Sequence, residues 1–361
     1  MMTEIDKLLE KEYLDKNDLI TLLNANKTEA EAIFKKSSEI KQQYIGNTTY
    51  FRGLIEYSNI CEKNCYYCGI RKGNKNVQRY KVTKEEVLEA AKFAYDNKYG
   101  SVVLQSGEIS SPAFTKSIAE MVEGMKELSN NELGITLSCG EQTEEVYKLW
   151  HEKGATRYLL RIETSNRELY YKLHPNDAEH NYEERLNCLK LLKKVGYQVG
   201  TGVMIGLPFQ TIEDLADDLL FMREFDIDMC GMGPYIEHHD TPLYEHRGIL
   251  MSKDERFFLS LKMVALLRIL MKDINLAATT AMQTLDKLGR EKAIKVGANI
   301  VMPNLTPVKY RDEYLLYEDK PCTTESPEEC RGCLEVRIKL AGDDIGYGEW
   351  GDSKHFAKRT E

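Results

Sequence analysis

The chain has 361 residues, and its 58 acidic and 49 Lys or Arg side chains give a formal net charge of −9. Hydrophobic residues make up 42 % and charged residues 30 %, a globular balance that excludes disorder, collagen and coiled coil. The acidic charge argues against a nucleic-acid binder, which would present a basic face. The first residues lack the layout of a signal peptide, and no apolar run reaches the roughly 18 residues that cross a bilayer. We therefore expect a cytoplasmic protein with no nucleic-acid or membrane partner.

The pattern of polar and apolar residues divides the chain into two parts. Residues 1–46 predict short polar helices, which form an N-terminal helical segment. From about residue 50, an apolar strand-like run, a loop and an amphipathic helix alternate. The predicted strands are 51–58, 101–105, 134–138, 157–161, 199–205, 228–233, 274–280 and 298–303.

This sustained alternation predicts parallel strands joined by right-handed crossovers. Eight strands is the number that closes a TIM barrel, so we predict an α/β fold, a (β/α)8 barrel, over residues 47–310. A doubly wound open sheet is the alternative that the same alternation allows. Residues 311–361 lack this rhythm and are predicted to form a C-terminal extension.

The predicted helices carry signals at both ends. Capping-box or first-turn patterns mark three helix starts, at Thr83 with Glu86, at Ser252 with Glu255, and at Ser111–Pro112. Four glycines follow helical stretches where a left-handed C-cap is expected, namely Gly100, Gly154, Gly196 and Gly297.

Three of the nine cysteines lie in ICEKNCYYCGI, directly after the first predicted strand. Cys61, Cys65 and Cys68 have the spacing C-x3-C-x2-C. Three thiolates on one short loop can bind three corners of a cubane iron–sulfur cluster, which leaves the fourth iron open as in a catalytic metal site. The alternatives are a zinc site lacking its fourth ligand and three unrelated core cysteines. The next residues, GIRKGNKNVQRY, offer zinc no Cys or His, and the polar loop is unlike a core, so we favour the cluster.

Polar side chains also gather at the ends of the other predicted strands, where a TIM barrel builds its active site. Gln105-Ser106-Gly107-Glu108 follows the second strand, although a turn with an incidental carboxylate would also explain it. The other candidates are Thr136 and Ser138 on the third strand, Arg161 and Glu163 at the fourth, Arg185 at a helix start, and Thr279 and Thr280 at the seventh. Together these groups suit a zwitterionic cofactor and an anionic or polar, metal-bound substrate.

A second cysteine group, Cys322, Cys330 and Cys333, lies in PCTTESPEECRGC with the spacing C-x7-C-x2-C. It predicts an accessory iron–sulfur cluster outside the barrel strands, with zinc binding or a reducible disulfide as alternatives. The remaining cysteines are predicted to be core or loop residues, namely Cys139, Cys188 and Cys230. His238-His239-Asp240 has a metal-like composition, but adjacent histidines on a loop are more often solvated or substrate-facing, and we assign no metal to them.

The first cysteine group, with the aromatic Tyr67 before its last cysteine, resembles the radical S-adenosylmethionine (radical SAM) superfamily. From about residue 45 to 350 the chain is also similar to the HydE-type maturases of FeFe-hydrogenase. The matching stretches include SNICEKNCYYCGIR, VLQSGE, RYLLRIET, VMIGLPFQTIEDL, ATTAM, ANIVMPNLTPVKYR and the C-terminal cysteine triad. The resemblance implies a complete (β/α)8 barrel with an enclosed cavity, a 4Fe-4S cluster and bound SAM.

The resemblance also implies roles for individual residues. Those that would bind SAM are Tyr67, Gln105, Ser106, Glu163 and Arg185. Those that would line the substrate cavity are Thr136, Arg161, Thr279, Thr280 and Tyr310. The C-terminal triad matches a second cluster that some family members lack. Ile162 stands where His can occur in the family, which leaves no role here for that ring.

The implied reaction is the reductive cleavage of SAM to a 5′-deoxyadenosyl radical. This radical would act on a cysteine-bound iron complex carrying CO and cyanide, toward the di-iron subcluster of hydrogenase. The implied partners are sister maturases that supply the complex and a reductant protein such as ferredoxin or flavodoxin. The alternative functions are a methylornithine synthase-like mutase, biotin synthase and a non-catalytic iron–sulfur carrier.

Overall fold

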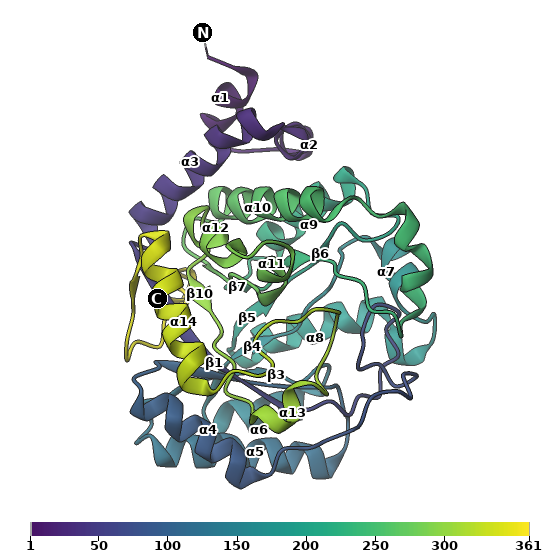
Figure 1. Cartoon of the computed structure of the whole chain (residues 1–361), viewed down its shortest axis with the longest axis vertical. Coiled ribbons are helices and arrows are strands. Elements are labelled where there is room, and N and C mark those ends of the chain that lie inside the picture. The colour runs from purple at the N-terminus through teal and green to yellow at the C-terminus, as the bar shows by residue number, and fades with distance from the viewer. Residues whose placement is uncertain (1, 361) are drawn as a thin grey trace.

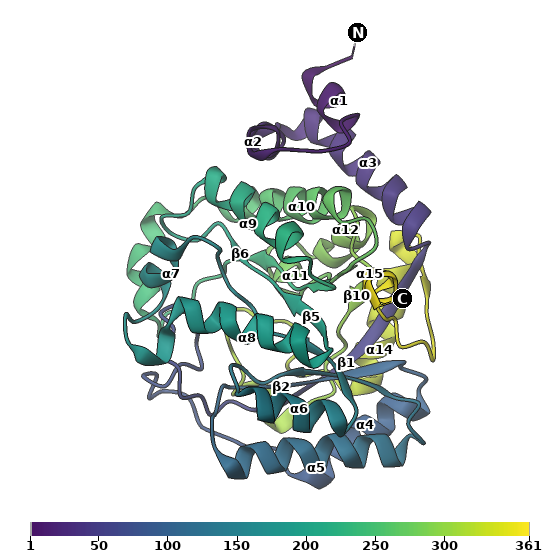
Figure 2. The same cartoon turned by 180° about the vertical axis from the view of Figure 1, so that it is seen from behind.

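The computed structural model describes residues 2–360 and has a barrel of parallel strands at its centre (Figures 1 and 2). The strands are β1 (Thr48–Ser58), β2 (Ser101–Ser106), β3 (Gly134–Ser138), β4 (Ala155–Leu159), β5 (Gln198–Thr201), β6 (Met204–Ile205), β7 (Met229–Cys230), β8 (Gly233–Pro234), β9 (Asn275–Leu276) and β10 (Ile300–Val301). The order around the sheet is β10-β1-β2-β3-β4-β5-β7-β9. Backbone hydrogen bonds from Asn299 to Leu276 and from Ala278 to Ile300, both 2.9 Å, join its two ends. The predicted α/β barrel is therefore confirmed over the open sheet.

Each predicted strand range contains an observed strand, but the fifth and sixth are interrupted. In these two, β6 continues β5, β8 continues β7, and β6 pairs with β8. The interruption follows from a close backbone approach, because a Cβ on Gly202 would lie 2.1 Å from the carbonyl oxygen of Gly231.

Helices surround the barrel in the order that the crossovers require. They are α4 (Lys84–Asp96), α5 (Pro112–Leu128), α6 (Glu144–Glu152), α7 (Arg167–Leu173), α8 (Tyr182–Val195), α9 (Ile212–Phe225), α10 (Lys253–Leu270), α11 (Thr280–Leu285), α12 (Gly289–Lys295) and α13 (Val308–Arg311). The capping boxes predicted for α4 and α10 are present, and Ser111 caps α5.

The expected left-handed conformation occurs at three of the four glycines, namely Gly154, Gly196 and Gly297. The expectation for Gly100 is wrong, because Lys98 takes the positive φ of 58° instead. Gly100 is needed for another reason. A Cβ there would lie 1.5 Å from the carbonyl oxygen of Glu349, so only glycine lets that segment pass.

Three helices precede the barrel: α1 (Glu4–Leu9), α2 (Lys16–Asn24) and α3 (Lys27–Tyr44). They project from one side of the molecule, where α3 packs against α10 and α2 against α9 (Figure 1). Among residues 2–360, no helix is long and apolar enough to cross a membrane.

The C-terminal extension contains α14 (Pro327–Ala341), β11 (Asp344–Ile345) and α15 (Lys354–Thr360). β11 pairs with the start of β1, and the segment after it closes the end of the barrel opposite the predicted site. There the carbonyl oxygen of Gly351 accepts hydrogen bonds from Arg52 at 3.0 Å and Asn275 at 2.8 Å. Asp352 pairs with the fully buried Arg157.

Candidate cluster and cofactor site

The loop after β1 carries Cys61, Cys65 and Cys68 with free thiols, half-buried against the carboxyl ends of the strands. Burial and the neighbouring thiols Cys68 and Cys61 raise the pKa of Cys65 well above its ordinary value, and burial with Cys61 raises that of Cys68 to about 12. Three thiolates this close repel one another, so the set is stable in its ligating form only around a cationic centre. The donor set fits an iron–sulfur cluster.

A buried group of four charges lies behind this loop. Lys63 contacts Glu108 at 3.0 Å and Glu141 at 2.8 Å, and Arg185 contacts Glu141 at 2.8 Å. The two carboxylates outweigh burial and raise the pKa of Lys63. The backbone N–H of Glu108 donates to the sulfur of Cys61 at 3.4 Å. The charge group therefore connects the loop after β2 to a cysteine of the cluster loop.

A cavity of about 220 Å³ lies beside the cysteine loop at the carboxyl ends of the strands. Among the residues predicted for the site, it is lined by Tyr67, Cys68, Gln105, Ser138, Arg161, Glu163, Thr279 and Thr280. Residues far apart in the sequence thus meet in one cavity. A larger open groove of about 600 Å³ lies between α5 and α6, away from the strand ends.

Arg161 and Glu163 form the charged pair on the β4 side of this cavity. Arg161 Nη2 lies 2.9 Å from Glu163 Oε2 and donates to the carbonyl oxygen of Val203 at 3.0 Å. Glu163 has a φ of 67°, a left-handed conformation that is strained for a residue with a side chain. Burial, Cys65 and the charge of Glu163, in this order, raise the pKa of Tyr67, and Glu163 lines the same cavity as Tyr67 and Cys68.

The structure does not bring four predicted residues to the cavity lining. Ser106 donates to the carbonyl oxygen of Ser58 at 3.4 Å, and Arg185 belongs to the charge group behind the loop. Thr136 accepts a hydrogen bond from Arg157 at 3.0 Å and lines a separate cavity of about 40 Å³ deeper in the barrel. Tyr310 stacks on Tyr80 and donates to Glu86 at 3.1 Å.

Sequence reasoning missed four polar residues of the cavity wall: Glu56, Tyr235, Tyr317 and Lys320. Glu56 stands near the carboxyl end of β1, directly after the apolar residues Leu54 and Ile55, and such an isolated carboxylate is a signal that could have identified it. Tyr317 and Lys320 belong to residues 312–321, which we call the roof segment. No periodic pattern marks that segment.

The C-terminal cysteines do not line the cavity. Cys322 follows the roof segment directly, and Cys330 and Cys333 lie on α14. A hydrogen bond with the Cys330 thiol lowers the pKa of Cys322, and Arg337 donates to the exposed Cys333 at 3.3 Å. The other predicted packing cysteines, Cys139, Cys188 and Cys230, are buried.

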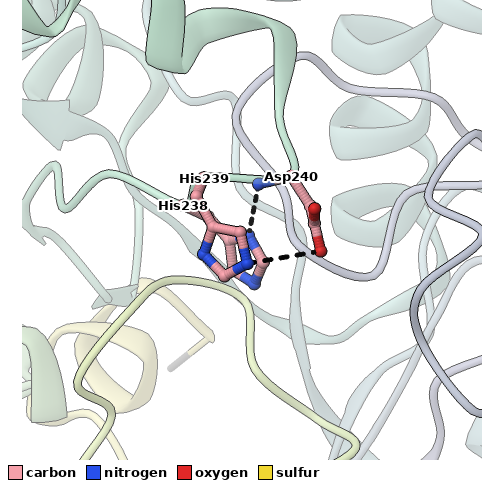
Figure 3. A group of neighbouring side chains, drawn as sticks. All are labelled: His238, His239 and Asp240. Carbon is pink, nitrogen blue, oxygen red and sulfur yellow. Dashed lines mark hydrogen bonds and ion pairs between the residues drawn. The ribbon is translucent and has the colours of Figure 1, made fainter.

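His238, His239 and Asp240 offer ligand atoms within 4.8 Å of one another, on the loop after β8 (Figure 3). His238 Nδ1 accepts the backbone N–H of Asp240 at 3.2 Å, and the two imidazole rings stack. His239 Nδ1 lies 2.7 Å from Glu318 of the roof segment. These side chains connect the loop to the roof segment.

Comparison with known proteins decides the family. Residues 55–222, which include the cysteine loop, match the radical SAM superfamily. Over 324 residues the chain is 47 % identical to the FeFe hydrogenase maturase subunit HydE of Thermotoga maritima, covering 90 % of this chain and 89 % of that protein. The chain belongs to the HydE family of radical SAM enzymes. A HydE family member is expected to use a 4Fe-4S cluster and SAM.

This HydE family member is also similar to two proteins outside the HydE family. It is 28 % identical to the 3-methylornithine synthase of Methanosarcina barkeri, covering 84 % of this chain and 83 % of that one. The crystal structure of the maturase HydG from Carboxydothermus hydrogenoformans superposes with a TM-score of 0.79 at 20 % identity, covering 98 % of this chain and 81 % of that chain. The second likeness shows the shared fold.

Proposed function

We propose that the chain is a maturase of FeFe-hydrogenase that cleaves SAM and acts on a cysteine-bound iron complex carrying CO and cyanide. The observation that carries the proposal is one cavity in which Cys68 of the cysteine loop meets the polar residues Arg161, Glu163, Thr279 and Thr280. The similarity to a HydE maturase supports the assignment to the assembly of the di-iron subcluster.

The three cysteines of the loop after β1 would hold the 4Fe-4S cluster. Bound there, the cluster supplies the electron that splits SAM into methionine and a 5′-deoxyadenosyl radical. A second feature of the cavity also fits a ligand. The buried hydroxyl of Tyr235 lines it and has no hydrogen-bond partner within residues 2–360. A buried hydroxyl without a partner is costly, and a bound polar ligand would relieve that cost.

The chain's own residues bind, orient and exclude water. Gln105, whose amide donates to Tyr314 at 3.3 Å, and Glu163, held by Arg161, would fix the polar groups of SAM together with Tyr67. Leu54, Leu159 and Met302 form apolar parts of the wall, which keep water from a reactive radical. On the substrate side, Arg161, Thr279 and Thr280 would contact the iron complex.

The residues outside the cavity have supporting roles in this proposal. Arg185 would act through Glu108 and the cysteine loop, and Ser106 through the end of β1. Cys322, Cys330 and Cys333 would hold an accessory cluster outside the cavity, since none of them lines it. A sister maturase would deliver the iron complex, and ferredoxin or flavodoxin would supply electrons.

An anaerobic in vitro maturation assay tests the function. Hydrogenase activity should depend on adding this chain to the other maturases, and Cys65→Ser should abolish both activation and release of 5′-deoxyadenosine. The same preparations are tested for conversion of lysine to 3-methylornithine. Mutase activity without hydrogenase activation would overturn the proposal in favour of the methylornithine synthase alternative.

A further inference from the structure

Two charged residues of the cavity wall have no role in the function proposed above. Glu56 comes from near the carboxyl end of β1, and Lys320 comes from the roof segment. Lys320 Nζ lies 2.5 Å from Glu56 Oε1, and their side chains are only 7 % and 2 % exposed. The pair therefore joins the wall of the barrel to the segment that covers it.

The roof segment is held at several points, so Lys320 has a defined position. The N–H of Gly69, next to Cys68, donates to the carbonyl oxygen of Leu316 at 2.9 Å. The N–H of Glu318 donates to the carbonyl oxygen of Glu237 at 3.0 Å. A lysine fixed in this way has little side-chain entropy left to lose when a ligand binds.

Both members of the pair keep hydrogen-bonding capacity. A lysine ammonium has three N–H donors, and Lys320 uses two, toward Glu56 and toward the carbonyl oxygen of Tyr314 at 2.9 Å. Within residues 2–360 it has no third oxygen acceptor, and its other contact is the ring of Tyr314, whose centroid lies 5.1 Å from Nζ. The other carboxylate oxygen of Glu56 has only a long contact of 3.5 Å with the amide of Asn304.

The charges of the cavity are balanced in two places. Arg161 with Glu163 forms one neutral pair on the β4 side, and Lys320 with Glu56 forms another at β1, which is separated from β4 by β2 and β3. Removing an ion pair from water is costly, so such a pair gives weak stabilisation by itself. Two neutral pairs in one cavity match two ligands that each carry both signs of charge.

We propose that the Glu56–Lys320 pair recognises the amino-acid group of the substrate. Lys320 contacts the α-carboxylate, and Glu56 contacts the α-ammonium. The inference deepens the proposed function, because the amino acid in that proposal is the cysteine bound to iron. Glu163, which lines the cavity together with Tyr67 and Cys68, remains for SAM, and Arg161 stays on the substrate side with Thr279 and Thr280.

Binding of three small thiols tests this recognition without any hydrogenase. The probes are L-cysteine, 3-mercaptopropionate, which lacks the ammonium, and cysteamine, which lacks the carboxylate. Each is titrated by anaerobic calorimetry into reconstituted enzyme saturated with SAM. Lys320→Met should weaken L-cysteine and 3-mercaptopropionate by at least about tenfold and leave cysteamine unchanged. Glu56→Gln should weaken cysteamine and L-cysteine while 3-mercaptopropionate binds as well or better.

The matched control is Lys309→Met, because Lys309 lies outside the cavity on α13 and pairs with Glu86 at 2.7 Å. The neutral double variant Glu56→Gln/Lys320→Met covers the case in which a single variant does not fold, and it should lose the preference for L-cysteine over cysteamine. The proposal is wrong if wild type binds none of the probes, if Lys320→Met keeps wild-type affinity for L-cysteine, or if all three probes weaken equally. Probe selectivity that survives a failed maturation assay would retain the recognition and reject only the proposed function.

Discussion

Arg161 contacts the carboxylate of Glu163, two residues further along the same chain, with 2.9 Å between Nη2 and Oε2. Glu163 makes this contact from a left-handed backbone conformation, with a φ of 67°, which is strained for a residue with a side chain. The N–H of Glu163 donates to the carbonyl oxygen of Gly202 at 3.0 Å, so the backbone is held independently of the arginine.

Arg161→Ala should therefore separate two functions. We expect substrate turnover to fall about a hundredfold because a cation in the cavity is lost, whereas SAM affinity changes less than about tenfold because the Glu163 backbone stays in place. Calorimetry with SAM and the release of 5′-deoxyadenosine with and without substrate measure the two effects. Unchanged turnover would remove Arg161 from the substrate site.

Replacing Cys330 and Cys333 by Ser tests the accessory cluster. None of the C-terminal cysteines lines the cavity, so we expect loss of up to one cluster's iron with SAM cleavage preserved. Iron and sulfide analysis of anaerobic protein, alongside the cleavage assay, gives both values. Abolished cleavage would show that the triad takes part in the chemistry.

Asp218 on α9 should make stability depend on pH. Burial raises its pKa to about 7, against hydrogen bonds from the N–H and hydroxyl of Ser165, both 2.6 Å. Between about pH 4 and 7 the native state keeps a proton that the unfolded state releases. The contribution of Asp218 to stability is therefore complete below about pH 4 and is lost as the pH rises from there through the folded pKa of about 7. Between pH 5.5 and 8, the free energy of unfolding of wild type, measured in urea, should fall by up to about 2 kcal/mol more than that of Asp218→Asn. Equal losses in the two proteins would contradict the assignment.

Asp352→Ala should destabilise the end of the barrel that lies opposite the predicted site. Arg157 is fully buried, and removal of the carboxylate leaves its guanidinium without a charge partner. Because Asp352 is 42 % exposed, we expect about 1–3 kcal/mol, below the loss for a fully buried pair. The matched control is Asp217→Ala, which removes an exposed pair with Lys16 and should cost under about 1 kcal/mol in the same denaturant titration.

The eight-stranded barrel was predictable because each strand and helix carries its own local periodicity. The breaks after β5 and β7 were not, since they depend on Gly202 and Gly231 meeting across the sheet. The requirement for Gly100 was likewise not predictable, because it depends on contact with the backbone at Glu349, which is distant in the sequence.

The candidate site divides in the same way. The cysteine loop is contiguous in the sequence, and its spacing alone identifies its chemistry. Thr136 lies on β3 two residues before Ser138, which places it one layer deeper in the barrel. The Glu56–Lys320 pair joins residues that are 264 positions apart, and no local pattern marks Lys320.

The C-terminal segment that closes the end of the barrel opposite the site has a consequence for synthesis on the ribosome. Gly351 and Asp352 come after all eight strands in the sequence, yet they provide the acceptors for Arg52 and Arg157. A nascent chain that has completed its strands still carries two inward-facing arginines without these partners. Barrel assembly therefore finishes only when this later stretch leaves the exit tunnel.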